Sequence, residues 1–283
     1  MSAATGRSNS TGASGAGGPD RPPPLEVRGL TLRFGGVEAL AGVDLRLEEG
    51  ELLALVGPNG AGKTALLNCI TGIYRPQAGR ITLFGQEVTG LKPWQVARLG
   101  VGRSFQHAEV FPSLTVVENL LLGLQASRRP GFLAYALHWG PGRRQEVRDR
   151  EAVEEVVEFF ELERYRKQRA GNLPYGLQKL VGVARAVCGR PRVLLLDEPA
   201  SGLNREEKEN LARFILRLQA EWRLPILWVE HDLQMVVDLA DRIAVLDYGV
   251  KIADGPPAEV VRSPAVIDAF VGTGNFSLPV GGE

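Results

Sequence analysis

The segment Gly57-Pro58-Asn59-Gly60-Ala61-Gly62-Lys63-Thr64 constrains this chain more than any other part of the sequence. An apolar run at 51–56 precedes it, and a helical pattern at 65–70 follows it. Strand, glycine-rich turn and helix start are the context in which such a segment binds phosphate groups. Glycines let backbone N–H groups converge on phosphate oxygens, and the helix N-terminus adds partial positive charge. We therefore predict that residues 57 to 64 all contact the phosphates of a nucleotide.

Two further parts of the expected site follow from the residue types. Lys63 should reach the β- and γ-phosphates, and the Thr64 hydroxyl should bind Mg²⁺. An apolar strand at 193–196 ends in Asp197-Glu198. We expect Asp197 to hold the Mg²⁺ shell, directly or through water, and Glu198 to polarise the water that attacks the γ-phosphate. Such an acidic pair is more often a helix-capping turn, but the phosphate-binding loop upstream favours the functional interpretation.

Composition limits the remaining function classes. The chain has 283 residues, of which 44% are hydrophobic, and its 33 Lys and Arg balance its 33 Asp and Glu. This balance argues against a nucleic-acid binder that relies on bulk charge. No stretch approaches the roughly 18 uninterrupted apolar residues of a membrane span. Residues 1–24 read as a disordered tail and not a signal peptide, so a membrane role would come through a partner.

The two cysteines, Cys69 and Cys188, both lie in apolar helical patterns without metal-ligand spacing. We interpret them as reduced core residues of a cytosolic protein rather than as a disulfide.

Hydrophobic periodicity predicts an α/β protein with a parallel sheet. Between 110 and 190 a helical insertion interrupts this core. The expected strands cover 25–34, 43–47, 79–84, 101–105, 192–197, 225–229 and 243–247, and the expected helices of the second half cover 205–221 and 232–240.

Four additional segments, in order along the chain, resemble motifs of one family, the ATP-binding subunits of ABC transporters. They are Phe34, Gln106 in the run 103–106, the loop 201–204, and His231 in the run 229–232. The resemblance covers about residues 25–272, followed by a tail at 273–283, and implies an ABC-type P-loop NTPase domain with ATP and Mg²⁺ as cofactors. It implies that Phe34 stacks on adenine, that Gln106 senses Mg²⁺ and the γ-phosphate, and that His231 contacts the γ-phosphate.

The sequence Leu173-Pro174-Tyr175-Gly176 is similar to the signature motif of branched-chain amino-acid importer ATPases, in which Gly176 would bind a phosphate across a dimer interface. Four further features fit the same group: Asn204, the run 103–107, the run 118–120 and the tail 264–272. That tail could equally be only a C-terminal amphipathic helix. The chain departs from the family pattern at Leu177, where Gln is usual, and at Leu180, where a basic residue is common. Pro174 lacks the hydroxyl of the usual Ser, so its side chain contributes less to binding the phosphate.

The resemblance also implies the partners. They are a paralogous ATPase subunit or a second copy in a head-to-tail dimer, two membrane permeases and a substrate-binding protein, at the cytoplasmic face of the plasma membrane. Alternatives are the ATPase of a urea, lipid or lipopolysaccharide transporter, or a non-transport ABC ATPase, which would carry a coiled-coil insertion or two ATPase domains. A GTPase would need an Asn-Lys-x-Asp motif, which the sequence lacks. The sequence does not name the solute.

Arginines and aromatic residues mix at 127–144. Such mixtures can mark a nucleic-acid surface. The balanced total charge instead favours a loop of the helical subdomain, so we expect no nucleic-acid partner.

Overall fold

The computed structural model describes residues 21–104, 110–126, 141–231 and 233–271 of the chain. Expectations for Gln106, for residues 1–20, for the tail 273–283 and for 127–140 concern residues outside these ranges.

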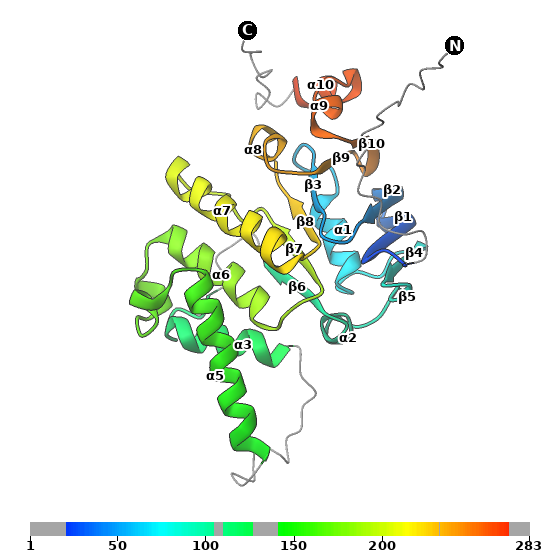
Figure 1. The fold of residues 1–283 in the computed structure, drawn as a ribbon. Coiled ribbons are helices and arrows are strands. Elements are labelled where there is room, and N and C mark those ends of the chain that lie inside the picture. Colours follow the sequence, from blue (N-terminus) through cyan, green and yellow to red (C-terminus); the bar gives the residue numbers. More distant parts are fainter. Residues whose placement is uncertain (1–20, 105–109, 127–140, 232, 272–283) are drawn as a thin grey trace, which may run out of the picture.

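The core is a six-stranded sheet in the order β10-β9-β3-β8-β7-β6 (Figure 1). All neighbours from β9 to β6 are parallel, and only β10 pairs antiparallel. Every residue of β3 and β7 is buried, as expected for apolar strands covered on both faces. The strand bounds are β3 Leu52–Val56, β6 Val101–Ser104, β7 Val193–Asp197, β8 Ile226–Val229, β9 Arg242–Asp247 and β10 Val250–Gly255.

A second, four-stranded antiparallel sheet has the order β2-β1-β4-β5. Its strands are β1 Leu25–Phe34, β2 Val37–Leu47, β4 Ala78–Leu83 and β5 Gln86–Glu87. The expected strand at 43–47 therefore begins earlier, at Val37, across a hairpin that pairs Phe34 with Val37. Register shifts along the β1–β2 ladder break the alternation of buried and exposed residues, which hid the first half of β2 from the period-2 pattern.

The helices lie on both sides of the parallel sheet (Figure 1). Alternate residues of β3 and β7 point into two different apolar clusters, one shared with α1 and the antiparallel sheet, and one shared with α3, α5, α6 and α7. The α-helices are α1 Lys63–Ile70, α2 Pro93–Arg98, α3 Val116–Ala126, α5 Pro141–Phe159, α6 Tyr175–Cys188, α7 Arg205–Trp222, α8 Leu233–Val237, α9 Pro257–Val260 and α10 Pro264–Val271. Two 3₁₀ turns, Glu163–Tyr165 and Ala170–Asn172, connect α5 to α6.

The α/β architecture with a helical insertion confirms the expected fold class. The expected helix at 232–240 was too long, because α8 ends at Val237 and a turn follows. Sequence periodicity did not reveal β10, β5 or α2, which are short or carry mixed burial patterns. No helix within the described ranges is both long and apolar enough to cross a membrane.

The structure confirms the interpretation of the cysteines as free core thiols, because both are buried and unbridged. Burial raises the pKa of Cys69 to about 11 and that of Cys188 to about 12. Since the thiolate is the reactive species, we expect both thiols to react slowly with Ellman's reagent at mildly alkaline pH in the native chain. The same chain unfolded in guanidinium chloride should titrate two thiols rapidly. Rapid modification of the native chain would contradict this assignment.

Candidate nucleotide-binding site

The predicted phosphate loop connects β3 to α1, as its sequence context indicated. Two of its glycines are fixed by close approaches to other backbone segments. A Cβ on Gly57 would lie 2.1 Å from the Leu246 carbonyl oxygen, and one on Gly62 would lie 2.5 Å from the Ala39 carbonyl oxygen. Gly62 also has a φ of 102° at the N-cap of α1, a conformation that glycine adopts without a steric penalty. The loop is therefore shaped by its tertiary neighbours as well as by its own sequence.

Backbone hydrogen bonds hold the end of the loop in place. The Gly249 N–H, in the β9–β10 turn, donates to the Ala61 carbonyl at 3.0 Å. The Gly249 carbonyl in turn accepts from the Ala41 N–H of β2 at 2.9 Å. One turn thus ties the phosphate loop to the antiparallel sheet.

Lys63 lies across this loop. Its Nζ donates to the carbonyl oxygens of Gly57 at 2.7 Å and of Pro58 at 3.1 Å. Burial lowers the pKa of Lys63, and the nearby carboxylates of Glu198, Asp197 and Glu230 oppose that shift. Thr64, the second residue of α1, is exposed.

Phe34, the residue expected to stack on adenine, lies at the end of β1 and is 49% exposed. The Tyr74 ring contacts it edge-on, with the ring centroids 5.1 Å apart and the planes at 77°. An aromatic ring that keeps about half its surface open can offer a face to a planar base.

Asp197 lies at the carboxyl end of β7 and is buried. Its Oδ2 accepts a hydrogen bond of 2.7 Å from Arg103 of β6, and both side chains are almost fully buried. Its Oδ1 is buried as well, and makes no hydrogen bond within the described residues. Buried carboxylate oxygens are rarely left without a partner, so Oδ1 is an atom that a bound ligand could use.

The residues fit Mg²⁺ bound together with nucleotide. Asp197 supplies an oxygen and Thr64 a hydroxyl, and Mg²⁺ is held in proteins by a few such oxygens plus substrate phosphates. No group of three or more His, Cys, Asp or Glu in the described parts of the chain could hold a metal by itself. A metal in this site would therefore depend on the phosphates.

Glu198 follows Asp197 in a sharp turn, with a φ of 44° that is unusual for a residue with a side chain. Three bonds hold its backbone. Its N–H donates to the Val229 carbonyl at 3.0 Å, and its carbonyl accepts from Lys179 Nζ at 3.3 Å and from the Ser201 N–H at 3.2 Å. Its Oε2 lies 3.7 Å from His231 Nδ1. The structure thus brings together two residues that the sequence predicted as catalytic.

Charge in this region is both buried and balanced. Asp197, Glu198 and Glu230 act electrostatically on Lys63 and Lys179, and Asp197 pairs with Arg103. Glu230 accepts from the Ala200 N–H and from Trp228 Nε1, each at 3.2 Å, and burial raises its pKa. The carboxylates are therefore compensated by cations from three different elements, α1, α6 and β6.

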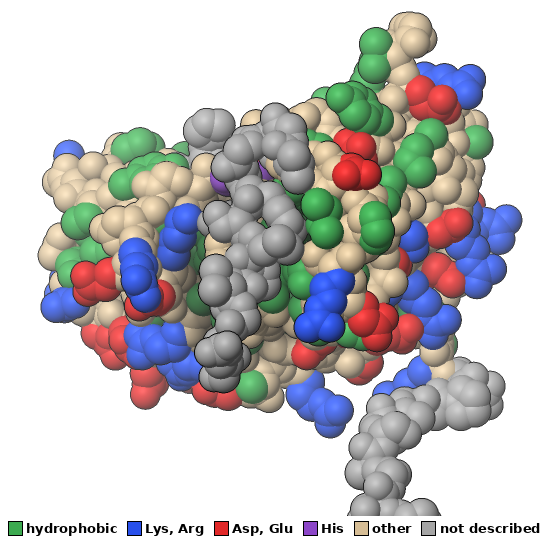
Figure 2. All heavy atoms as spheres, turned by 90° about the horizontal axis from the view of Figure 1, so that it is seen from above, with side chains coloured by type: hydrophobic (Ala, Val, Ile, Leu, Met, Phe, Trp, Pro, Cys, Tyr) green, Lys and Arg blue, Asp and Glu red, His purple; other side chains and the backbone are tan. Residues whose placement is uncertain are grey.

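A cavity of about 550 Å³ opens at the phosphate loop. It is lined by Gly57 to Ala61, by His231, by the Asp247–Tyr248 turn and by four residues of α10. Neither Gly176 nor Phe34 is among the residues that line it. Figure 2 shows one face of the molecule, seen from above relative to Figure 1, on which basic, acidic and hydrophobic side chains are interspersed.

The signature motif instead contacts the loop 201–204 and the start of α7. Pro174 is the N-cap of α6 and makes no side-chain capping bond, because its ring has no group that can form one. A Cβ on Gly176 would lie 2.4 Å from Glu207 Oε1, and one on Gly202 would lie 3.1 Å from the Tyr175 ring. Glu207 is held in a capping box with Asn204, whose side chain accepts from the Glu207 N–H at 3.0 Å.

This capping box explains why Asn can stand at position 204 in place of Asp, since Asn and Asp are equally good N-caps. The departures from the family pattern at Leu177 and Leu180 also have a structural reason. Leu180 is buried in the core, and Leu177 packs against it.

Sequence analysis missed several residues of this site. It used Arg103 only as a family marker, and it gave no role to Lys179, Glu230 or α10. Arg103 and Lys179 lie in a strand and a helix whose sequence patterns do not show that these side chains are buried. A buried charge needs a compensating partner, and that need becomes visible only in the folded structure. The one available signal was a charged residue inside an otherwise buried strand, at Arg103.

A second cavity, of about 880 Å³, lies between α2, β6, α3 and α6. Its wall includes Arg103 and Thr71. The side chain that holds Asp197 is therefore also part of this cavity's lining.

A glycine loop between a buried parallel strand and a helix, with a carboxylate on a nearby strand end, defines a P-loop nucleotide-binding protein. A family model for ABC transporters matches residues 40–201, and one described as branched-chain amino acid ATP-binding cassette transporter matches residues 250–274. The chain belongs to the ABC transporter family and is one of its ATP-hydrolysing, nucleotide-binding subunits.

Individual relatives agree with this assignment. The chain is 42% identical to the high-affinity branched-chain amino acid transport ATP-binding protein BraF of Pseudomonas aeruginosa, over 88% of this chain and 98% of the relative. It is 39% identical to LivG of Escherichia coli K12, a protein of the same description, with the same coverage.

Solved structures with the same fold include a nucleotide-free ATP-binding cassette from an ABC transporter, with a TM-score of 0.76 and 29% identity. That match covers 87% of this chain and 98% of the other. A dimeric bacterial ABC transporter cassette matches with a TM-score of 0.68 and 25% identity, over 82% and 98% of the two chains.

The contact between Gly176 and Glu207 predicts a specific cost of adding one methyl group. Gly176→Ala should displace Glu207 from its capping box and lower the free energy of unfolding by about 1 kcal/mol. Gly182→Ala, on the same helix, is the matched control: nothing lies within 4 Å of the added Cβ, and Ala should raise stability by about 1 kcal/mol. Urea denaturation measures both. A second Glu207→Ala change should remove most of the difference, and equal effects of the two Ala variants would contradict the contact.

Proposed function

We propose that this subunit powers an importer of branched-chain amino acids. The observation that carries the proposal is the identity of 42% and 39% to BraF and LivG over nearly their whole lengths. The match of residues 250–274 adds support, because α10 in that segment lines the cavity at the phosphate loop. The part of the chain typical of this group thus lies beside the nucleotide site.

In this proposal, ATP binds with adenine on Phe34 and with its phosphates on the loop 57–64. The loop's backbone N–H groups, the start of α1 and Lys63 meet the phosphate charge. Thr64 and Asp197 hold Mg²⁺, which when bound neutralises charge that develops on the phosphate oxygens. The unpaired, buried Oδ1 of Asp197 supports this role.

Glu198 orients the attacking water and accepts its proton. Its backbone is fixed from β8 and from α6, so its carboxylate has a defined position at the end of β7. His231 lies beside it and contacts the γ-phosphate. Gln106, which lies outside the described residues, completes the set by sensing Mg²⁺ and the γ-phosphate.

The signature motif acts in the opposite subunit. Gly176 lies at the start of α6, against Glu207 of α7, where helix N–H groups can bind a phosphate of a second chain. We propose a head-to-tail dimer with a paralogous ATPase or with a second copy. Two permeases and a substrate-binding protein complete the assembly, with this subunit peripheral at the cytoplasmic face of the plasma membrane.

The first prediction separates binding from turnover. Lys63→Ala should abolish ATP binding, because the phosphates lose the cation that lies across the loop. Glu198→Gln keeps the shape of the side chain but cannot accept a proton, so the variant should bind ATP, lose turnover and accumulate as an ATP-bound dimer. Equilibrium binding of a fluorescent ATP analogue, phosphate release and size-exclusion chromatography measure the three effects.

Glu206→Gln, an exposed carboxylate in the first turn of α7, is the matched control and should behave as the unmodified chain. If Glu198→Gln hydrolyses ATP at the normal rate, Glu198 is not the residue that activates water.

The second prediction concerns the solute. In proteoliposomes that contain the permeases and the binding protein, leucine, isoleucine or valine should stimulate ATP hydrolysis, whereas urea and lipids should not. Calorimetry on the isolated subunit should detect no binding of these amino acids, because the site found here is accounted for by nucleotide and Mg²⁺. Stimulation by urea or lipid alone would assign a different cargo, and tight binding of an amino acid to the isolated chain would reveal a solute site within it.

A further inference from the structure

We propose that Arg103 is a positioning residue for Mg²⁺: it holds one oxygen of Asp197, so that the other oxygen is presented to the ion. The inference rests on the proposed role of Asp197 as a Mg²⁺ ligand. It assigns to Arg103 a function that neither the family match nor the glycine-loop motif contains.

The contacts of Arg103 connect three elements. From β6, its Nη2 donates to Asp197 Oδ2 at 2.7 Å, at the end of β7. Its Nη1 donates to Asn68 Oδ1 at 2.8 Å and to Thr71 Oγ1 at 3.0 Å, both near the end of α1. The guanidinium therefore links the Asp197 carboxylate to the helix that carries Lys63 and Thr64 at its start.

Burial makes this arrangement rigid. The side chains of Arg103 and Asp197 are only 7% and 4% exposed, so bulk water competes little for their hydrogen bond. Hydrogen bonds between ionised groups are stronger than neutral ones, and a planar guanidinium directs several of them at fixed angles. Asn68 and Thr71 fix the plane of the guanidinium, and the guanidinium in turn fixes the plane of the carboxylate.

The two oxygens of Asp197 consequently have different tasks. Oδ2 is occupied by Arg103, whereas Oδ1 is buried without a hydrogen bond in the described part of the chain. A carboxylate free to rotate would exchange the two oxygens and lose this division. Residues that orient a metal ligand in this way typically contribute about 10-fold to 100-fold in metal affinity.

The charge of Arg103 alone predicts the opposite effect, which makes the inference testable. A cation this close to Asp197 reduces the attraction of the carboxylate for Mg²⁺, so a purely electrostatic role would give tighter metal binding once the cation is removed. A positioning role gives weaker binding.

The experiment measures metal affinity in the ATP-bound chain, with Mn²⁺ as the probe and electron paramagnetic resonance as the readout. Arg103→Met should weaken Mn²⁺ binding by about 10-fold or more. ATP binding in the presence of EDTA should stay within about twofold, because the phosphate loop keeps its own contacts. Arg103→Lys keeps the charge but cannot reach Asp197, Asn68 and Thr71 together, so it should show most of the same loss.

A second variant avoids the cost of removing a buried ion-pair partner, which can destabilise the fold. The double change Asn68→Ala with Thr71→Val leaves Arg103 and Asp197 in place but releases the guanidinium, and it should weaken Mn²⁺ binding by a smaller factor. Unchanged or tighter Mn²⁺ binding in Arg103→Met, or an equal loss of metal-free ATP binding, would overturn the positioning role.

Asp197→Asn separates this inference from the function on which it rests. If Asp197→Asn weakens Mn²⁺ binding and Arg103→Met does not, only the role of Arg103 is wrong. If neither change affects Mn²⁺, the assignment of Asp197 as a metal ligand is wrong as well.

Discussion

The buried charges at the carboxyl ends of the parallel strands are the constraint on which the rest of this structure depends. Charged groups cannot stay ionised inside a protein without partners, and here Asp197, Glu198 and Glu230 lie within an apolar sheet. Cations from far along the chain offset them: Arg103 of β6 pairs directly with Asp197, and Lys63 of α1 and Lys179 of α6 interact electrostatically with all three carboxylates. Each of these elements must dock correctly for the charges to be balanced, so the site and the fold are stabilised by the same contacts.

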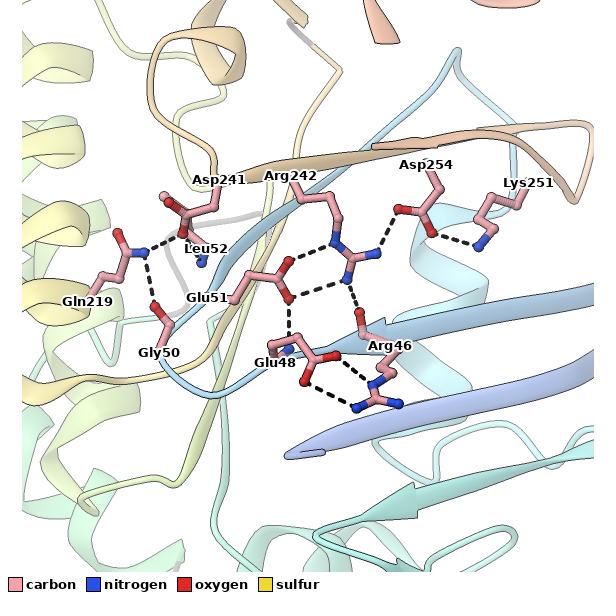
Figure 3. Close-up of polar contacts among 10 residues, drawn as sticks. All are labelled: Arg46, Glu48, Gly50, Glu51, Leu52, Gln219, Asp241, Arg242, Lys251 and Asp254. Atoms are coloured by element: carbon pink, nitrogen blue, oxygen red, sulfur yellow. Dashed lines mark hydrogen bonds and ion pairs between the residues drawn. The ribbon is translucent and has the colours of Figure 1, made fainter. Parts of the chain in front are cut away.

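A similar linkage occurs at the opposite end of the parallel strands, where β3 and β9 begin. Figure 3 shows Arg242 of β9 between Glu51 and Asp254, with its guanidinium also donating to the Arg46 carbonyl of β2. These bonds connect the strand after the active-site loops to the segment that leads into β3. Neighbouring Asp241 accepts from the Leu52 N–H at 2.8 Å, at the start of the strand that carries the phosphate loop. Asp241 and Arg242 therefore help to fix the position of the start of β3 relative to β9.

Much of the architecture could be predicted because its signals are local. The strands at 192–197 and 243–247 and the helix at 205–221 were found within one residue of their bounds, since apolar runs and charged helical faces need no distant partner. The first half of β2 and the strand β10 were missed, because register shifts and half-exposed residues blur their periodicity. The order of the strands could not be read from patterns of this kind at all. The proposed catalytic and metal-binding roles remain predictions, although the structure brings Glu198 and His231 together.

The sequence by itself determined the chemistry that this chain can offer: a glycine loop with Lys63 and Thr64, an apolar strand that ends in Asp197-Glu198, and free cysteines in the core. Those features depend on residue type and spacing over a few residues. Only the tertiary structure decided which groups share the site. It joined Arg103 to Asp197 across 94 positions, placed α10 beside the phosphate loop, and packed Gly176 against Glu207. The reason is physical: hydrophobic patterns specify which face of an element is buried, whereas the partner of a buried charge is set by how the elements pack together.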